Sequence, residues 1–249
     1  MTNRVWAVVP AAGVGSRFRA SKPKQYSGLG SSTLIEQTLQ QLIKSGVFSG
    51  IVVAISDGDQ WFSQLAVASQ PLIRIVSGGS TRASSVLSGL RALAKESGAH
   101  DWVMVHDAAR PLVAASDILR LKEHLQKHQR AAILGCPVAD TVKRVTDGGL
   151  LASADEDPRQ AQTIIGTVDR RELWLAQTPQ AAQLDTLLAV LEQLDADNKL
   201  DEVTDEASAL EMRGHQVDIV EGNRANFKVT LPEDLLMAEA ILKSQETSS

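Results

Sequence analysis

The chain has 249 residues, 43% of them hydrophobic and 22% charged, which is typical of a globular protein with a full hydrophobic core. Its formal net charge of −5 argues against a nucleic-acid-binding surface, and no apolar run reaches the roughly 18 residues of a membrane span, so we expect neither partner. The single cysteine, Cys136, excludes an internal disulfide framework and favours a reducing, cytoplasmic location.

Short apolar runs alternate with segments of helical period along the first half of the chain. We expect strands at 4–9, 51–55, 72–76 and 102–105, and helices at 33–44, 82–95 and 118–127. These strands are continuously apolar, which is typical of a mostly parallel sheet that helices cover on both faces. The sequence therefore predicts a three-layer α/β fold, with residues 1–136 and 171–243 in one domain.

The alternation breaks between residues 137 and 170, where we expect a β-arm that projects from the sheet. Two strands, at 138–145 and 163–168, enclose the polar, turn-rich stretch "TDGGLLASADEDPRQAQ". A long surface loop is the alternative interpretation. After the arm we expect helices at 184–194 and 204–213, a strand at 217–220, a last helix that starts at "LPED" and a frayed tail at 244–249.

A loop rich in glycine and cations, "PAAGVGSRFRASKPKQY", follows the first expected strand. The dinucleotide pattern G-x-G-x-x-G begins at Gly13 and Gly15 but meets Phe18 in the place of its third glycine, and the G-K-[ST] of a P-loop is missing. What remains is G-x-G-x-R followed by K-P-K, with Arg17 inside the loop and Lys22 and Lys24 on either side of Pro23. Cations held close to a polyphosphate suit phosphoryl or nucleotidyl transfer, whereas a solvated basic turn is the alternative.

Asp107 follows the strand expected at 102–105, at the edge where open α/β sheets bind their ligands. A carboxylate there could hold Mg²⁺ together with phosphate oxygens, or could cap a turn, and we expect Arg110 to pair with it. His124 and His128, four residues apart on an expected helix, are more typical of a solvated helix face than of a metal pair. Cys136 is typical of a small core residue.

Further motifs follow in a fixed order along the rest of the chain. They are "GGSTRASSVLSGL" at 78–90, "VHDAARP" at 105–111, "PVADTVKR" at 137–144, "TVDR" at 167–170, "QTPQ" at 177–180, "TDEASALE" at 204–211 and "NFKVTLPED" at 226–234. Together with the opening loop, they make the chain resemble the 2-C-methyl-D-erythritol 4-phosphate cytidylyltransferase family of the non-mevalonate isoprenoid pathway. The resemblance implies a Rossmann-like nucleotidyltransferase fold and transfer of CMP from CTP to methylerythritol phosphate, with release of pyrophosphate.

The resemblance also implies roles for individual residues. Arg17 and Lys24 would be catalytic, stabilising the α- and β-phosphates of CTP in the transition state. The nucleotide-binding residues would be Pro10, Ala11, Ala12, Gly13, Gly15, Gly79, Ser80, Arg82, Ser85, Asp107 and Ala108. The phosphate of the second substrate would be bound by Thr141, Arg170, Thr178, Thr204 and Lys228. Asp107 would hold Mg²⁺ or another divalent cation, and Ser80 stands where the family often carries an acidic residue.

In the family the arms of two subunits interlock, so the resemblance implies a homodimer in which Thr141 and Arg170 complete the neighbour's site. An isolated two-stranded arm is marginally stable in water, and this one carries several apolar residues that need a covering surface. Three other functions stay open at this point. They are a cytidylyltransferase for another polyol phosphate such as ribitol 5-phosphate, a Rossmann-type oxidoreductase and a non-catalytic nucleotide sensor.

Overall fold

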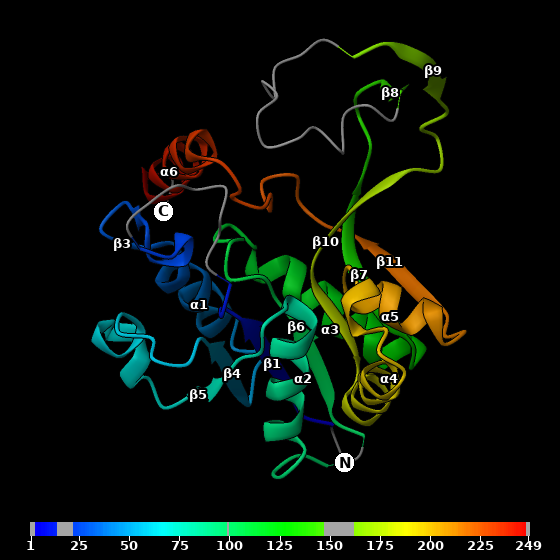
Figure 1. Ribbon diagram of the computed structural model, residues 1–249. Helices are drawn as coiled ribbons and strands as arrows, with labels where there is room; N and C mark the ends of the chain where they lie inside the picture. Colours follow the sequence, from blue (N-terminus) through cyan, green and yellow to red (C-terminus); the bar gives the residue numbers. More distant parts are fainter. Residues whose placement is uncertain (1–2, 14–21, 99, 147–161, 248–249) are drawn as a thin grey trace.

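The computed structural model of the chain describes residues 3–13, 22–98, 100–146 and 162–247 (Figure 1). Seven strands form the central sheet: β1 (Val5–Pro10), β4 (Gly50–Ile55), β5 (Ile73–Ser77), β6 (Trp102–Val105), β7 (Ala131–Pro137), β10 (Trp174–Gln183) and β11 (Val217–Glu221). Their order across the sheet is β11-β7-β10-β6-β1-β4-β5. All neighbours are parallel except β10, which runs antiparallel to both β6 and β7.

Helices cover both faces of this sheet. The principal helices are α1 (Leu34–Lys44), α2 (Arg82–Leu93), α3 (Ala115–His128), α4 (Leu184–Ala196), α5 (Glu206–Met212) and α6 (Pro232–Thr247). One core cluster joins α1 and α3 to the sheet, and a second joins α2, α4 and α5 to it. In β1, Val5 and Val9 belong to the first cluster and Trp6 and Val8 to the second, which explains the continuous apolar run. The predicted three-layer α/β fold is confirmed.

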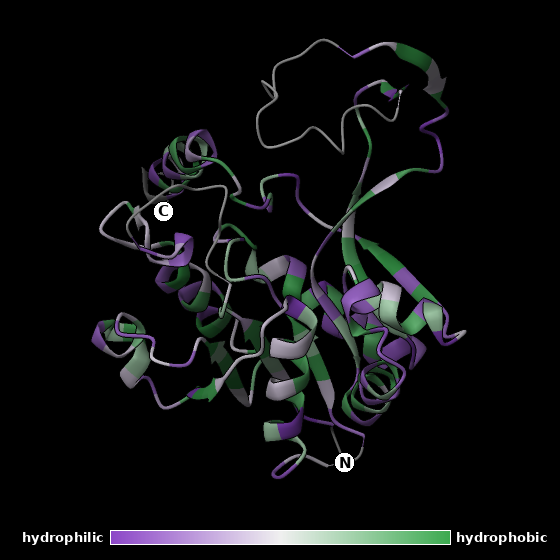
Figure 2. Cartoon of the chain, in the orientation of Figure 1, coloured by the Kyte–Doolittle hydropathy of each residue, from purple (hydrophilic) through white to green (hydrophobic). Residues whose placement is uncertain are grey.

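Hydrophobic residues concentrate in the central strands, whereas polar residues line the outer surfaces of the helices (Figure 2). A third, smaller core cluster packs α6 against Leu29 and Leu34, beside the loop that follows β1. None of the helices in the described ranges combines the length and the apolar character of a membrane span.

Several element boundaries differ from those predicted. Helix α3 begins at Ala115 rather than at 118, α5 begins at Glu206 rather than at 204, and α6 reaches Thr247, so that part of the expected tail is helical. Strand β10 was not predicted. It contains Pro179 and several polar residues, a pattern that argues against a central strand, and its register shifts between Ala176 and Gln180.

An arm projects from the sheet beyond β7 and β10, at the upper right of Figure 1. It carries an antiparallel pair, β8 (Val142–Val145) and β9 (Ile164–Val168). The predicted hairpin is therefore confirmed, and the alternative of a long surface loop without paired strands is wrong. The strand predicted at 138–145 is shorter than expected, because it starts only at Val142. The insert at 147–161 lies outside the described residues.

Two further small elements lie near the first loop. Strands β2 (Gly28–Leu29) and β3 (Ser32–Thr33) form a minimal hairpin, and Thr33 then caps α1 through a capping box with Glu36. Short 3₁₀ helices complete the described chain: η2 (Lys24–Tyr26), η3 (Phe62–Gln64), η4 (Ala66–Ser69) and η6 (Leu200–Glu202). Helix η2 carries Lys24, one of the cations of the predicted site.

Candidate active site

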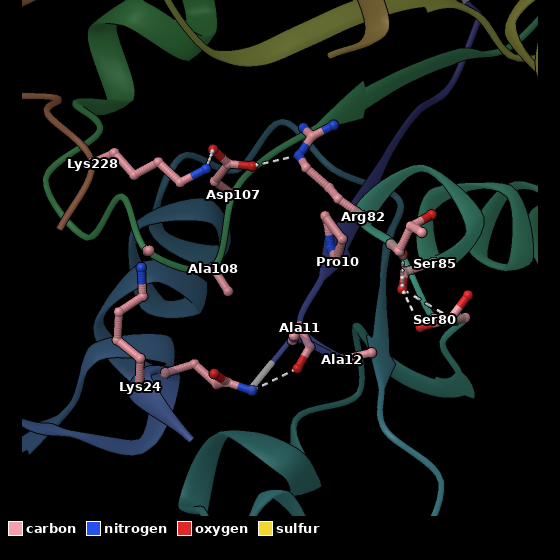
Figure 3. A pocket seen from close by; sticks show the side chains of 15 residues that line it. Pro10, Ala11, Ala12, Lys24, Ser80, Arg82, Ser85, Asp107, Ala108 and Lys228 are labelled. Atoms are coloured by element: carbon pink, nitrogen blue, oxygen red, sulfur yellow. Dashed lines mark hydrogen bonds and ion pairs between the residues drawn. The ribbon is translucent and has the colours of Figure 1, made fainter. Parts of the chain in front are cut away.

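A cavity of about 210 Å³ opens at the carboxyl edge of the sheet, beyond the ends of β1, β5 and β6 (Figure 3). It is lined by Pro10, Ala11, Ala12, Gly13, Lys24, Gln25, Gly79, Ser80, Thr81, Arg82, Ser85, Asp107, Ala108, Ala109 and Lys228. Ligands of open α/β sheets bind at this edge, because the loops that leave parallel strands converge there. The size and the position of the cavity suit part of a nucleotide.

Ala11, directly after β1, is bonded to the short helix η2. Gln25, which is buried, donates from Nε2 to the carbonyl of Ala11 at 2.7 Å. Tyr26 donates its hydroxyl to Asp59 at 2.7 Å, and burial together with this carboxylate raises the pKa of the phenol. Lys24 donates from Nζ to the carbonyl of Val229 at 2.7 Å. Bonds from Gln25 and Tyr26 thus anchor helix η2, whose Lys24 lines the cavity.

The start of α2 forms the opposite wall of the cavity. Thr81 caps this helix in a capping box with Ser84. Ser85 accepts from the backbone N–H of Gly79 at 3.1 Å. A Cβ at Gly78 would lie 2.6 Å from the Cβ of Ala12, so glycine permits the close approach of the two loops.

Asp107 lies at the centre of the cavity wall and contacts three cations. Its Oδ1 is 2.9 Å from Nε of Arg82, and its Oδ2 is 2.9 Å from Nζ of Lys228 (Figure 3). Arg110 lies 3.6 Å from Oδ2, which confirms the predicted pair. Burial alone would raise the pKa of Asp107, but Arg82, Lys228 and Arg110 together lower it far below its usual range. The carboxylate is therefore ionised at any physiological pH.

Arg82 also binds a second carboxylate. Its Nη1 and Nη2 donate to the two oxygens of Glu206 at 2.8 and 2.9 Å, which is a bidentate pair. Burial works against the charge of Arg82, but Glu206 and Asp107 outweigh it and raise the pKa of the guanidinium. Arg82 thus connects the cavity to α5, on the far side of β10.

His106 and Thr178 support the backbone of Asp107 from below the cavity. Nε2 of His106 faces the carbonyl of Arg110 at 3.1 Å, so this nitrogen carries the proton and Nδ1 accepts from the Thr178 hydroxyl at 3.0 Å. The same hydroxyl accepts from the N–H of Asp107 at 3.1 Å. Burial lowers the pKa of His106 to about 4, so the ring is neutral.

Many of the predicted site residues come together in this cavity. The lining contains Pro10, Ala11, Ala12, Gly13, Lys24, Gly79, Ser80, Arg82, Ser85, Asp107, Ala108 and Lys228. Gly15 and Arg17 lie outside the described residues. Thr141 and Arg170 lie on the exposed arm and Thr204 on an exposed turn, so none of the three lines the cavity of its own chain.

Thr178 lies under the cavity instead of lining it. Its side chain is 3% exposed, and its hydroxyl bonds to His106 and to the backbone of Asp107. The structure thus gives this residue contacts inside the fold, whereas the sequence predicts a contact with substrate phosphate. That contact stays a prediction.

Sequence reasoning missed several residues of the site. Gln25, Thr81 and Ala109 line the cavity, Glu206 binds Arg82 of the lining, and Asn226 binds Thr178 behind it. All of these lie inside the quoted motifs, but the partners of Glu206 and Asn226 are distant along the chain, so no local pattern marks their roles.

Cys136 and the pair of His124 and His128 lie outside the cavity lining. Cys136 is buried. His124 stacks on the exposed His128 with 4.3 Å between ring centroids and binds Asp218 at 2.9 Å. In the described ranges, no group of three or more His, Cys, Asp or Glu residues is arranged to hold a metal ion.

Asp107 is the one carboxylate in the described cavity lining, and both of its oxygens already contact cations. A carboxylate oxygen accepts more than one partner, so a further contact is available. Three neighbouring positive groups, however, oppose binding of another cation by the protein alone. This donor set fits a Mg²⁺ ion that shares Asp107 with anionic phosphate oxygens, which is the usual way in which proteins bind this ion.

The fold and the cavity together define a class of protein. The site combines a loop with glycine after β1, two lysines at one cavity and an ionised aspartate at the carboxyl edge of the sheet. This combination is typical of an α/β nucleotidyltransferase. The model of one family, described as 2-C-methyl-D-erythritol 4-phosphate cytidylyltransferase, matches residues 5–244. The chain belongs to this family.

Individual relatives agree with this family over nearly their whole length. The chain is 46% identical to 2-C-methyl-D-erythritol 4-phosphate cytidylyltransferase of Vibrio vulnificus (strain CMCP6) over 246 residues, covering 99% of this chain and 97% of the relative. Among solved structures, the Francisella tularensis enzyme of that name superposes with a TM-score of 0.79 at 35% identity, covering 96% of this chain and 99% of the other. The Thermus thermophilus enzyme gives a TM-score of 0.75 at 28% identity, with coverages of 96% and 99%.

Proposed function

We propose that the protein transfers CMP from CTP to 2-C-methyl-D-erythritol 4-phosphate, giving 4-diphosphocytidyl-2-C-methyl-D-erythritol and pyrophosphate. The observation that carries the proposal is the cavity itself: within a chain of this family, Lys24, Lys228 and an ionised Asp107 meet in one space at the carboxyl edge of the sheet. Cations of this kind stabilise the charge that develops on a phosphoryl group during transfer.

The reaction that we propose is a direct in-line displacement. A phosphate oxygen of the methylerythritol phosphate attacks the α-phosphorus of CTP, the new P–O bond forms, and the bond to the β-phosphate breaks as pyrophosphate leaves. Because the attacking oxygen is already anionic, no general base is required. This is consistent with His106, which is buried, neutral and bonded on both nitrogens inside the fold.

CTP would be bound between the two walls of the cavity. The backbone of residues 11–13 would follow the triphosphate, and the segment from Gly79 to Ser85 would contact the cytosine. Lys24, with Arg17, would stabilise the charge on the α- and β-phosphates in the transition state. Lys228 would bind the phosphate of the acceptor.

Mg²⁺ or another divalent cation would be held by Asp107 together with oxygens of the triphosphate. Bound in this way, it would neutralise phosphate charge and orient the leaving group. Arg82 keeps Oδ1 of Asp107 fixed, so the carboxylate offers Oδ2 towards the space where Lys228 lies.

The complete active site would belong to a homodimer. The arm exposes Ile164 and Ile165, at 58% and 59%, and two large apolar side chains so exposed on a two-stranded hairpin need a covering surface. A two-fold dimer with crossed arms would cover them and bring Thr141 and Arg170 to the phosphate site of the partner. We also infer a cytoplasmic location, because the lone Cys136 implies no disulfide within the chain.

The function can be tested by measuring pyrophosphate release with each nucleoside triphosphate and each of several polyol phosphates, in the presence of Mg²⁺. We expect the highest kcat/KM with CTP and methylerythritol phosphate. A preference for ribitol 5-phosphate would assign another acceptor to the same chemistry. Equal turnover with UTP would show that the pocket around Ser80 does not select cytosine, and no release with any pair would refute the proposal.

A further inference from the structure

Glu206 is a buried anion to which the reaction described above gives no part. Its side chain is 2% exposed, and it lies at the start of α5, across β10 from the cavity. We propose that Glu206 is a positioning residue: it locks Arg82 in the orientation that holds Asp107, so that Arg82 keeps this orientation when substrates bind. This inference rests on the proposed function of the cavity.

The geometry of Arg82 supports this role. Both terminal nitrogens of its guanidinium bind Glu206, at 2.8 and 2.9 Å, and Nε binds Asp107 at 2.9 Å. The guanidinium is planar, so fixing two of its nitrogens also fixes the direction of the third. Glu206 therefore determines where Nε points, and Nε determines where Oδ1 of Asp107 lies.

Glu206 is itself held rigidly. The buried Gln180 of β10 accepts from the N–H of Ala207 at 2.9 Å and donates to the side chain of Asp205 at 2.9 Å. In the sheet, Gln180 pairs with Val105, the residue at the end of β6 that comes shortly before Asp107. The positions of Glu206 and of Asp107, the two carboxylates that Arg82 connects, thus both depend on the neighbouring strands β10 and β6.

The charges around Asp107 explain why Arg82 needs to be held in one orientation. Arg82, Arg110 and Lys228 face Asp107, and Glu206 faces Arg82, which leaves one net positive charge in the group. Without Glu206, Arg82 would have one carboxylate partner and would be attracted to an incoming triphosphate. Lys228, at 40% exposure, has one carboxylate partner in the described structure and lies at the open side of the cavity.

The alternative is that the buried ion pair only stabilises the fold, since removing one partner of such a pair is commonly destabilising. Helix α2 offers a matched control for this alternative. Arg91, on the same helix, pairs with Glu192 of α4 at 3.1 Å, and both side chains are about half exposed. Glu192→Gln removes a carboxylate from an arginine of α2 without any connection to Asp107.

The test compares kcat, the Kd of CTP in EDTA and the thermal unfolding of the wild type, Glu206→Gln, Arg82→Met and the double variant Arg82→Met/Glu206→Gln. We expect Glu206→Gln to lower kcat by roughly 10- to 100-fold at temperatures where it is folded, because displacement of a reacting group by about 1 Å has this effect. The Kd of CTP without metal should not rise, because an Arg82 released from Glu206 attracts the triphosphate. Adding Glu206→Gln to Arg82→Met should cost no further activity, and Glu192→Gln should match the wild type.

Two outcomes would overturn the proposal. One is a folded Glu206→Gln enzyme with wild-type kcat, and the other is independent, multiplicative losses in the double variant. If Glu206→Gln does not fold, the double variant Arg82→Met/Glu206→Met replaces it, because this variant removes both buried charges together. It should fold and have the same kcat as Arg82→Met. A kcat above that of Arg82→Met would contradict the positioning role of Glu206. A wild type without cytidylyl transfer would refute the function instead. The Arg82 Nε–H signal in NMR spectra then still reports whether Glu206→Gln changes the guanidinium.

Discussion

Nζ of Lys228 lies 2.9 Å from Oδ2 of Asp107, so the cation expected to bind the acceptor phosphate is paired with the carboxylate expected to bind the metal. A lysine directed at Oδ2 opposes a second cation at that oxygen, and the same contact occupies one of its donors. We therefore expect binding of Mg·CTP and of the acceptor to separate the pair. Contacts of Lys228 with phosphate and of Asp107 with metal would then replace the ion pair.

The first prediction concerns this pair. Lys228→Met removes a cation that competes for Asp107, so the enzyme without nucleotide should bind Mn²⁺ more tightly, as measured by electron paramagnetic resonance. The KM for methylerythritol phosphate should rise at the same time, because a phosphate contact is lost. Lys243→Met, which alters an exposed lysine that pairs with Glu239 on α6, serves as the control. Unchanged Mn²⁺ affinity in Lys228→Met would show that the lysine does not compete with metal.

Lys24→Ala and Arg17→Ala should each lower kcat by about 100-fold or more, because removal of a single charge-stabilising donor has effects of this size. Circular dichroism should show an intact fold. Lys22→Ala, on the same segment but with an exposed side chain, is the matched control and should keep its activity. Near-normal turnover in either of the first two variants would remove that residue from the catalytic role.

The buried His106 predicts a loss of stability in mild acid. Its pKa is lowered from 6.5 to about 4 by burial, so between these pH values the unfolded chain binds a proton that the folded chain does not. Stability should therefore fall as the pH drops below 6.5, by roughly 2 kcal/mol at pH 5 for this group. Urea unfolding at pH 7 and pH 5 measures the difference. His106→Gln should lose less between the two pH values, and an equal loss would assign the acid sensitivity to other groups.

The shared site predicts complementation between subunits. Arg170→Ala and Lys24→Ala proteins should each be nearly inactive, and mixing them under conditions of subunit exchange should restore activity. A mixed dimer contains one site with both residues intact. Native mass spectrometry verifies that mixed dimers form. Mixed dimers without any regained activity would place Arg170 in the site of its own chain.

The sequence was informative wherever burial leaves a local pattern. Strands β1, β4 and β6 were predicted correctly because helices cover both of their faces, so nearly every side chain is apolar. The cavity could be anticipated because Gly13, Gly79 and Asp107 occur in compact motifs directly after β1, β5 and β6.

The elements and residues that the sequence did not predict are those whose burial leaves no local pattern. Strand β10 is polar in its centre, and its residues Thr178 and Gln180 are satisfied by His106, Asp205 and Ala207, whose positions no local pattern reveals. Likewise, the burial of Glu206 is explained by a partner 124 residues away in the sequence. Such charges and polar groups become visible as parts of a site only when the fold brings them together.

The stereochemistry of the reaction tests the central claim most directly. The enzyme is supplied with Mg²⁺, methylerythritol phosphate and one diastereomer of CTP that carries sulfur on the α-phosphate, and the product is analysed by ³¹P NMR. A direct in-line displacement predicts a single cytidylyl product with inverted configuration at the α-phosphorus. Retained configuration would indicate two successive displacements through a covalent enzyme intermediate, and this result or the absence of product would contradict the account.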